Sequence, residues 1–299
     1  MVIFVTGALG QLGQDLVPQL LSRGHRVIAT DLAPVHPHLP EGASYLSVDL
    51  TDAEAVAGAM RTAAPQAVIH CAAWTAVDAA EDPENQEKVW QVNVRATRNL
   101  ALACREMNCK IAYVSTDYVF SGRGETPWEA DCMDFDPQNV YGQTKLGGEM
   151  AVRELTGKHF IVRTAWVFGK HGGNFVSTML RLGRKLDSLR VVCDQIGTPT
   201  YTPDLARLLA DIIETEHYGT YHATNEGGFI SWYDFACEIF RQAGMEVRVS
   251  PVTTEEYGES KALRPKNSRL SKGKLTQMGF RPLPHWQDAL KRYLKELEE

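Results

Sequence analysis

A tyrosine and a lysine stand four positions apart in the segment NVYGQTKLGGE, residues 139–149. Residues three or four apart share one face of a helix, so the phenol of Tyr141 and the ammonium of Lys145 are expected to point into one site. A tyrosine normally titrates near about pH 10, and a neighbouring cation lowers its pKa, which suits the phenol to proton transfer near neutral pH. The alternative is an exposed helical pair without a chemical role.

The segment STDYVF, residues 115–120, supplies two more polar groups. It ends an apolar β-branched run, and doubly wound sheets bind their ligands at the carboxyl ends of the strands. There the Thr116 hydroxyl can donate a hydrogen bond to a substrate carbonyl while Tyr141 protonates it. Asp117 suits a sugar hydroxyl as an acceptor, and the alternative is that it caps the following loop.

Three glycines near the amino terminus have G-x-x-G-x-x-G spacing between an apolar run and a helical pattern. The first permits a tight turn, the second allows the backbone to approach a pyrophosphate, and the third allows the helix to pack close to the strand. The free amides of the helix then face the phosphates. The alternative is an ordinary turn. The predicted dinucleotide-binding residues of this loop are Gly7, Leu9, Gly10, Gln11, Leu12 and Gly13.

Asp31 ends the second apolar run, where an acid can accept hydrogen bonds from the ribose hydroxyls of adenosine. A carboxylate at this point repels a 2′-phosphate. The expected cofactor is therefore NADH or NADPH, with NADH preferred. Asp49 and Leu50 follow the next extended piece, YLSV, and are candidates to cover the adenine, although the segment DLTDAE equally suits a helix cap.

Five short apolar runs have to position these residues: 2–7, 26–31, 66–73, 110–116 and 159–169. Runs that are apolar nearly throughout are typical of strands buried on both faces, and helical segments between them provide the crossovers that parallel strands require. The pattern predicts an α/β fold with a doubly wound parallel sheet of the Rossmann type.

The pattern changes after about residue 170, where helices at 202–215 and 231–244 alternate with short extended pieces such as YHATN, before an amphipathic final helix. We expect an NAD(P)-binding Rossmann domain over residues 1–170, with some later segments returning to it. Residues 171–299 are expected to form mainly a smaller substrate-binding lobe. The Pro- and His-rich stretch 32–42 is expected to be a surface loop.

The 299-residue chain has a formal net charge of −6 and is 44% hydrophobic. An acidic chain has no general attraction for nucleic acid, so no such partner is expected. Its apolar runs are shorter than the roughly 18 to 20 residues that cross a bilayer, and it starts on MVIFVTG without a charged leader, so we expect a cytoplasmic protein without a membrane partner. Six scattered cysteines are expected to be free thiols.

The glycine spacing with a downstream Y-x-x-x-K resembles the extended form of the short-chain dehydrogenase/reductase superfamily. Seven segments, in order along essentially the whole chain, are similar to the dTDP-4-dehydrorhamnose reductase family: CAAWTAVDAAE, VNV, STDYVF, PQNVYGQTKLGGE, RTAWVFG, DQIGTPTYTPDLA and RPKNSRL. The resemblance implies NAD(P)H-dependent reduction of the 4-keto group of dTDP-4-dehydro-L-rhamnose, which gives dTDP-L-rhamnose for polysaccharide biosynthesis. It implies that the chemistry is carried by Thr116, Tyr141 and Lys145, with Asp117 beside them at the substrate.

The same resemblance assigns residues around the reaction centre. It implies that Trp166 packs against the sugar or the base, with a core tryptophan as the alternative. Ala72, Ala73 and Trp74 follow the third apolar run and are expected to border the dinucleotide. Asn93 is expected to hold a water or a backbone kink in the adjacent helix.

The segment RPKNSRL is a candidate site for the diphosphate of the dTDP-sugar. Arg264 and Arg269 offer forked donors, and Asn267 and Ser268 lie between them. The alternative is an exposed basic loop. The candidates that complete the nucleotide-sugar pocket are Gln195, Thr198 and Thr200, which in the alternative serve only turn conformation.

The resemblance also raises the questions of a homodimer and of bound magnesium. Some members of the family dimerise around magnesium held by glutamates, and the tail offers Glu296, Glu298 and Glu299. Acidic residues at a helix end are more often solvated, so no metal is predicted as required.

Two rival functions stay open at this point. One is another extended-superfamily enzyme acting on a nucleotide sugar, such as a 4-epimerase, which would retain its NAD. The other is a non-catalytic regulatory subunit like the β subunit of methionine adenosyltransferase. The intact STDYVF and RPKNSRL segments favour the reductase.

Overall fold

The computed structural model describes residues 1–34, 39–258 and 260–298. Its centre is a seven-stranded sheet in the order β11-β6-β5-β4-β1-β2-β3, in which every pair of neighbours is parallel. The doubly wound α/β fold is thereby confirmed. The strands are β1 (Val2–Thr6), β2 (Arg26–Asp31), β3 (Ser44–Ser47), β4 (Ala67–His70), β5 (Lys110–Thr116), β6 (His159–Thr164) and β11 (Gly219–His222).

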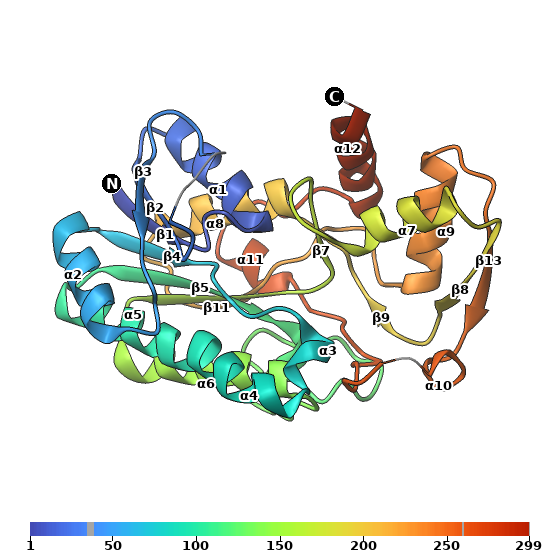
Figure 1. Ribbon diagram of the computed structural model, residues 1–299, viewed down its shortest axis with the longest axis horizontal. Helices are drawn as coiled ribbons and strands as arrows, with labels where there is room; N and C mark the ends of the chain where they lie inside the picture. Colours follow the sequence, from blue (N-terminus) through green and yellow to red (C-terminus); the bar gives the residue numbers. More distant parts are fainter. Residues whose placement is uncertain (35–38, 259, 299) are drawn as a thin grey trace.

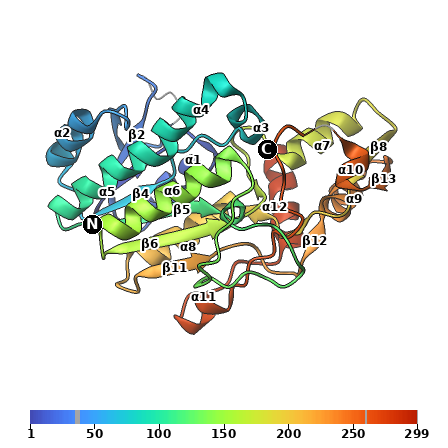
Figure 2. The same cartoon turned by 90° about the horizontal axis from the view of Figure 1, so that it is seen from below.

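Helices cover both faces of this sheet. In β1, Ile3 and Val5 pack toward α1 (Gln11–Ser22) and α8 (Thr202–Ile213), whereas Phe4 packs toward α2 (Ala53–Ala63), α5 (Ala96–Glu106) and α6 (Val140–Leu155). Figure 2 shows α5 and α6 running side by side along one face. Burial on both sides explains why these strands are apolar at consecutive positions.

The predicted strand 159–169 is interrupted in the structure. It divides into β6 and the two-residue β7 (Val167–Phe168), which leaves the sheet to pair with β10 (Thr200–Tyr201). The break falls at Trp166, which has a φ of +52°, in the left-handed region that an L-residue rarely adopts. The chain therefore turns away from the sheet at this tryptophan.

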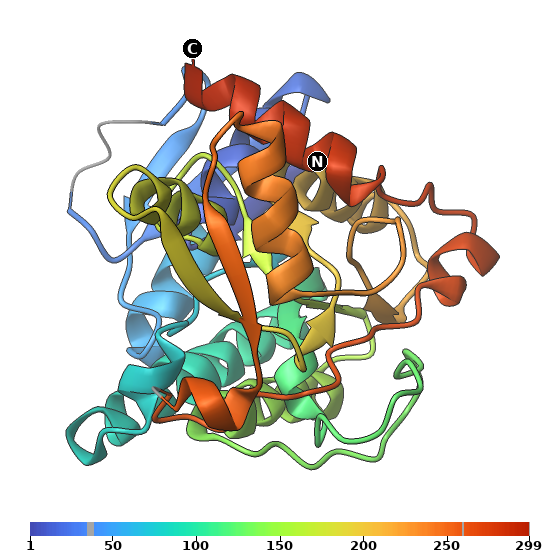
Figure 3. The ribbon, with the colours of Figure 1, turned by 90° about the vertical axis from the view of Figure 1, so that its right-hand side faces the viewer.

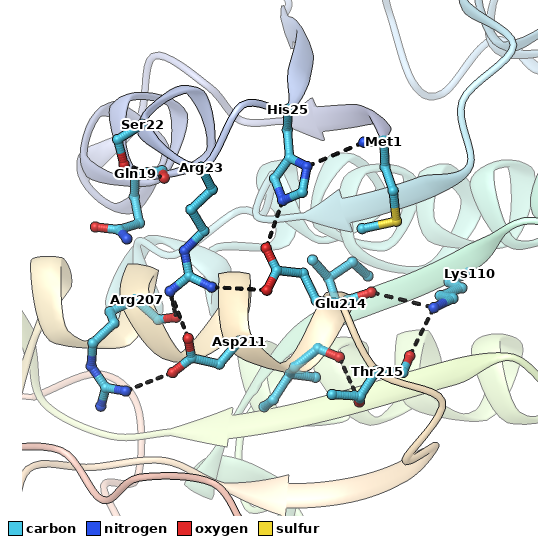
Figure 4. A network of polar contacts seen from close by, with 12 residues as sticks. Met1, Gln19, Ser22, Arg23, His25, Lys110, Arg207, Asp211, Glu214 and Thr215 are labelled. Atoms are coloured by element: carbon cyan, nitrogen blue, oxygen red, sulfur yellow. Dashed lines mark hydrogen bonds and ion pairs between the residues drawn. The ribbon is translucent and has the colours of Figure 1, made fainter.

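Charged side chains close the amino end of the sheet between α1 and α8 (Figure 4). The Arg23 guanidinium lies 2.6 Å from Asp211 and 3.2 Å from Glu214. The His25 ring lies 2.8 Å from Glu214 and 3.2 Å from the amino group of Met1. Each partly exposed pair adds only about 0–1 kcal/mol, but together they tie α1 to α8 at the edge opposite the carboxyl ends of the strands.

A second lobe follows the sheet domain, with its own core around Phe168, Phe235 and Tyr293. It contains α7 (Phe175–Gly183), α9 (Trp232–Gln242) and the parallel pair β8 (Ser188–Val192) and β13 (Arg248–Val252), at the right of Figure 1. In Figure 3, β8 and β13 lie beside α9, and α12 (Trp286–Glu298) crosses next to it.

The remaining elements are short. They are α3 (Val77–Ala80), α4 (Pro83–Trp90), a π-helical turn (Gln91–Arg95), a 3₁₀ turn (Asp117–Val119), β9 (Ile196–Gly197), β12 (Ile230–Ser231), α10 (Thr254–Tyr257) and α11 (Gly273–Gln277).

Several secondary expectations have clear outcomes. The helices expected at 202–215 and 231–244 form with slightly shorter bounds, as α8 and α9. All six cysteines are free thiols, as expected. Within the predicted loop 32–42, residues 35–38 lie outside the described residues. In the part of the chain that is described, no helix combines the length and apolar character needed to span a membrane.

Candidate active site

A cavity of about 750 Å³ opens at the carboxyl ends of the parallel strands. Much of its lining comes from residues at or after the carboxyl ends of β1 to β6, and α6 adds Tyr141 and Lys145. The cavity therefore lies across the point where the strand order reverses, between β1 and β4. Ligands of doubly wound sheets bind in this crevice. The predicted site residues that line the cavity are Gly7, Gly10, Gln11, Leu12, Gly13, Asp31, Asp49, Leu50, Ala72, Ala73, Thr116, Asp117, Tyr141, Lys145 and Trp166.

The glycine loop is shaped to receive a large anionic group. Gly7 has a φ of +65°, and a Cβ there would lie 2.6 Å from the backbone nitrogen of Ala72. A Cβ on Gly13 would collide with the carbonyl oxygen of Gly7 and lie 2.6 Å from Cα of Ala8. The amino end of α1 has no side-chain cap at Gly10, so its amides are available to a phosphate.

The carboxylate of Asp31 organises the same loop. It accepts hydrogen bonds from the backbone amides of Leu9, at 3.1 Å, and Leu32, at 2.8 Å. Leu9 itself does not line the cavity, but Asp31 and Leu32 do. The Asp49 carboxylate accepts from the amide and hydroxyl of Thr51, a turn contact, and still borders the cavity.

The start of α6 sets the direction of Tyr141 and Lys145. The Asn139 side chain caps the helix by accepting from the Gly142 amide at 2.8 Å, and the Val140 amide donates to Glu81 at 2.8 Å. A Cβ at Gly142 would collide with the carbonyl oxygen of Tyr118, so α6 sits against the segment after β5. Tyr141 therefore occupies the first turn and Lys145 the second, both facing the cavity.

Tyr141 keeps its proton in the cofactor-free protein. Burial raises the pKa of the phenol above its usual value, nearby Asp117 and Tyr118 add to the rise, and a hydrogen bond with Thr116 opposes it. The lowered pKa of Tyr141 expected from the spacing to Lys145 is not found in this state, because loss of solvation outweighs the opposing hydrogen bond with Thr116. A protonated phenol beside Thr116 is suited to donating a proton.

Lys145 is almost fully buried, with 3% of its surface exposed. Its ammonium donates to the backbone carbonyl of Val114 at 2.7 Å and lies 4.1 Å from the ring centre of Tyr113. Burial lowers the pKa of Lys145 to about 7, while Glu149 and Cys71 oppose that shift. The charge of this lysine therefore depends on its neighbours near neutral pH.

Asp117 is also buried, and burial raises its pKa to about 6, against hydrogen bonds from Ser268 and Thr116. Oδ1 accepts from the Thr116 hydroxyl at 3.1 Å. Among the described residues, Oδ2 has no donor in hydrogen-bonding geometry, although the Ser268 side chain is near. One oxygen thus remains available to a ligand hydroxyl in the cavity.

Trp166 stands at the junction of the two lobes. Its ring stacks on Trp232 with centroids 3.6 Å apart, and a Cβ on Gly197 would lie 2.9 Å from it. It also lines the cavity. The strained backbone at Trp166 thus places an aromatic surface beside the catalytic candidates.

Several predicted residues do not line the cavity. The Trp74 amide donates to Asn93 at 2.8 Å, and its indole donates to Ala76. Asn93 also donates to Thr144 at 3.0 Å and lies in the π-helical turn. The others outside the lining are Leu9, Gln195, Thr198, Thr200, Arg264, Asn267, Ser268 and Arg269.

Asn267 and its neighbours hold a loop in place. The side-chain amide of Asn267 donates to the backbone carbonyls of Arg123 and Thr126, and Asn267 is 1% exposed. Arg269 donates back to Asn267 Oδ1 at 3.0 Å. Gln195 donates to the Thr254 hydroxyl at 3.1 Å. These side chains already have protein partners.

Arg264 lies outside the cavity lining but contacts Tyr118, which is part of it. It pairs with Asp78 at 2.6 Å and donates to the Tyr118 hydroxyl at 3.3 Å. Asp78 also accepts from the Ser260 hydroxyl and the Ala262 amide. These hydrogen bonds and the ion pair hold segment 260–264 against α3, although the two are about 180 positions apart in the sequence.

Sequence reasoning missed several lining residues, among them Leu32, Val77, Tyr118 and the pair Gly172 and Gly173. The adjacent glycines before the Asn174 cap of α7 were a usable signal, since a backbone without side chains leaves room for a ligand. Tyr118, inside STDYVF, was a second signal, because its phenol faces Tyr141 edge-on at 5.5 Å.

The glutamates of the C-terminal tail, for which no required metal is predicted, form no ligand set in the described residues. Among residues 1–34, 39–258 and 260–298, no group of three or more His, Cys, Asp or Glu side chains could hold a metal ion. Glu296 and Glu298 lie on α12, and Glu299 is outside the described residues.

Comparison with known proteins adds a second line of observation. A family model described as RmlD substrate binding domain matches residues 1–299. A dTDP-4-dehydrorhamnose reductase of Streptomyces griseus is 42% identical over 293 residues, which are 96% of this chain and 90% of that relative.

Two solved structures resemble the whole chain. A dTDP-4-dehydrorhamnose reductase from Clostridium acetobutylicum is 41% identical, covers 100% of both chains and has a TM-score of 0.91. A dTDP-4-dehydrorhamnose reductase from Bacillus anthracis, solved in complex with NADP, is 39% identical, covers 99% of both chains and has a TM-score of 0.89.

Proposed function

The chain belongs to the RmlD substrate-binding domain family, and from that membership and the geometry of its cavity we propose that it is a dTDP-4-dehydrorhamnose reductase. It is an NAD(P)H-dependent oxidoreductase of the extended short-chain dehydrogenase/reductase type. It reduces the 4-keto group of dTDP-4-dehydro-L-rhamnose and yields dTDP-L-rhamnose.

The observation that carries this proposal is the meeting of two groups in one cavity. The glycine loop with its uncapped helix lines the same cavity as Thr116, Tyr141 and Lys145. A dinucleotide cradle next to a hydroxyl, a phenol and an ammonium suits carbonyl reduction.

The residues present fit a nicotinamide dinucleotide. The close packing of Gly7 and Gly13 leaves backbone amides, rather than side chains, facing the phosphates. Asp31, Asp49 and Leu50 would hold the adenosine end, and Ala72 and Ala73 the middle. When bound, the cofactor supplies a hydride. We keep NADH as the preferred cofactor because of Asp31, and NADPH as a competent one.

The catalytic side chains act on the substrate carbonyl. Thr116 donates a hydrogen bond to its oxygen, and Tyr141 delivers the proton when the oxygen gains charge. Lys145 stabilises the resulting phenolate through its own charge. Protonated Tyr141 suits the reductive direction, because burial has already secured the proton on the phenol.

The substrate residues form the second half of the proposal. Asp117 accepts from a sugar hydroxyl, and Trp166 packs against the sugar or base. Arg264 binds the diphosphate by exchanging its ion pair with Asp78 for one with a phosphate group. Gln195, Asn267 and Arg269 act by holding the surrounding segments, because each of these side chains already donates to a protein partner.

We propose that the two parts of the chain have the separate functions that the sequence indicated. Residues 1–170 bind the cofactor, and residues 171–299 mainly bind the sugar nucleotide. α8 and β11 are the later segments that return to the sheet domain. A cytoplasmic location and a homodimer belong to the proposal, supported by the free thiols and by the family resemblance respectively.

The test is oxidation of NADH and of NADPH by the purified protein with dTDP-4-dehydro-L-rhamnose, with the product identified by mass spectrometry. A deuterated hydride donor should deliver one deuterium to carbon 4 of the product. An epimerase would instead retain its NAD and transfer no label from added cofactor. Cofactor binding without any turnover would point to a regulatory subunit and overturn the proposal.

A further inference from the structure

A carboxylate one helical turn beyond Lys145 is buried in the protein. Glu149 is fully buried, on the same stripe of α6 as Tyr141 and Lys145, because the three lie four positions apart. A buried charge is costly unless it is paired and hydrogen-bonded. Glu149 meets that condition on the side facing the sheet.

Two strands hold this carboxylate. Arg163 on β6 donates to both of its oxygens, at 2.8 Å and 2.7 Å, and is itself fully buried. Ser115 on β5 donates to Oε1 at 2.6 Å. The remaining guanidinium nitrogen of Arg163 contacts the Ala130 carbonyl and His222. The carboxylate is thus fixed relative to the strands that carry Thr116 and Thr164.

The hydrogen bonds of Arg163 and Ser115 to Glu149 also fix the rotation of α6 about its axis. A Cβ on Gly148 would collide with the Tyr113 hydroxyl, so α6 lies tightly against β5. With Glu149 joined to Ser115 and Arg163, the helix face that bears Lys145 must point toward the cavity. The cationic end of Lys145 is then held by Val114 and Tyr113.

The charge balance around Lys145 depends on Glu149. The other titratable groups that influence it from the neighbouring elements are Cys71 after β4, His70 on β4 and Tyr113 on β5. Burial raises the pKa of Cys71 to about 12 and lowers that of His70 to about 3, so both are neutral. Burial also raises the pKa of Tyr113. Glu149, which forms an ion pair with Arg163 at 2.7 Å, is therefore the acidic partner of Lys145 in this set.

We propose that Glu149 is a positioning residue for the reduction: held by Arg163 and Ser115, it keeps Lys145 cationic and directed at the cavity. The proposal rests on the proposed function, since it assigns a role within that reaction. An arginine cannot release its proton, whereas a lysine can. If the carboxylate is lost, the buried cations Arg163 and Lys145 remain, together with the partly buried Arg153, which lies 3.6 Å from Glu149. Lys145 is the one of the three that becomes neutral.

The test measures the protonation of Lys145 directly. The protein is labelled with ε-13C-lysine, and the Lys145 signal is identified by its loss in Lys145→Met. Its pH titration is then followed by NMR without substrate or cofactor. This readout does not require the proposed substrate, so a wrong substrate and a wrong role for Glu149 give different results.

Three variants separate charge from packing. Glu149→Gln removes the charge and keeps the shape. Glu149→Gln/Arg163→Met removes both charges, which avoids an unpaired buried cation and is often tolerated by folds. Glu149→Asp keeps the charge. The matched control is Asp204→Asn. Asp204 is a buried carboxylate on α8, which packs on the opposite face of the sheet from α6, and it pairs with Arg292 at 2.7 Å.

The wild-type titration midpoint is expected near 7. It should fall by about one pH unit in Glu149→Gln and by less in the double variant. It should return toward the wild-type value in Glu149→Asp and stay unchanged in Asp204→Asn. The alkaline limb of the pH profile of kcat should move in the same direction, with little change in KM.

An unchanged Lys145 midpoint in folded Glu149→Gln or in the folded double variant would overturn the proposal. So would a failure of both variants to fold, because the pair would then be purely structural. A shift of similar size in Asp204→Asn would also count against it.

Discussion

The guanidinium of Arg264 lies 2.6 Å from the carboxylate of Asp78, and this pair joins the second half of the chain to α3, whose first residue, Val77, lines the cavity. About a third of the Arg264 side chain remains exposed, at 31%. A partner of this kind can be exchanged for a phosphate, because an exposed ion pair is only weakly stabilising.

Replacing Arg264 by Gln should therefore weaken binding of the nucleotide sugar. A charge-assisted hydrogen bond contributes about 1.5–3 kcal/mol, so KM for the dTDP-sugar should rise about 10- to 100-fold, while kcat changes little. Steady-state kinetics measure both constants. Arg241→Gln, on the exposed face of α9, is the matched control. Equal KM values for the two variants would show that Arg264 does not contact the substrate.

The Tyr141→Phe variant should keep cofactor affinity and lose turnover. Proton transfer by a positioned side chain contributes about 10²- to 10⁴-fold, so kcat should fall by that amount. Cofactor titration by fluorescence and steady-state assays measure the two quantities. Tyr257→Phe, at a half-exposed position, should match the wild type. Undiminished kcat in Tyr141→Phe would remove this phenol from the mechanism.

The Asp31→Asn variant should shift cofactor preference toward NADPH. An amide preserves an acceptor for the Leu9 amide but no longer repels a 2′-phosphate, which carries more than one negative charge. The ratio of kcat/KM for NADPH to that for NADH should rise at least about tenfold, or ~1.4 kcal/mol. Asp49→Asn serves as the comparison, and an equal rise there would contradict a specific role for Asp31.

The Gly13→Ala variant should lose both stability and cofactor binding. Its Cβ would collide with the Gly7 carbonyl, so either the helix or the loop must move. We expect a lower melting temperature and at least about a tenfold weaker cofactor affinity. Gly58→Ala in α2 is the control, because a Cβ there meets no atom within 4 Å. It should stabilise the fold by about 0.5–1 kcal/mol.

The burial of Lys145 should appear in the pH dependence of stability. The pKa of Lys145 is lowered from 10.5 to about 7 in the folded protein. Below pH 7 the lysine is protonated in both the folded and the unfolded protein, so the full cost of burying its charge lowers the stability of the fold. Between these values the unfolded chain binds more protons, so the free energy of unfolding rises with pH by up to about 1.4 kcal/mol per unit.

Urea unfolding of the cofactor-free protein near pH 6.5 and near pH 9 measures this slope. The wild type should gain stability relative to Lys145→Met, in which the titrating group is absent. If the stability difference between the two proteins is the same at both pH values, Lys145 does not titrate in this range.

The sequence was sufficient to identify the parts of the site that depend on neighbours along the chain. Tyr141 and Lys145 share a face because of helical spacing, and the Gly7-to-Gly13 loop is defined by a strand, a turn and a helix in succession. The apolar runs also predicted the parallel sheet, since burial on both faces leaves a continuous pattern. These features follow from local periodicity, which does not require knowledge of distant contacts.

Only the tertiary structure decided which distant groups meet. The buried Arg163 on β6 meets Glu149 because β6 lies beside β5, under α6. Arg264 meets Asp78 although 186 positions separate them. The raised pKa of Tyr141 arises from burial that spacing does not reveal, and the turn at Trp166 reflects packing against Trp232 and Gly197. Local pattern encodes the helices, the strands and their apolar faces, whereas the topology of the folded chain determines which distant residues meet and which polar groups are buried.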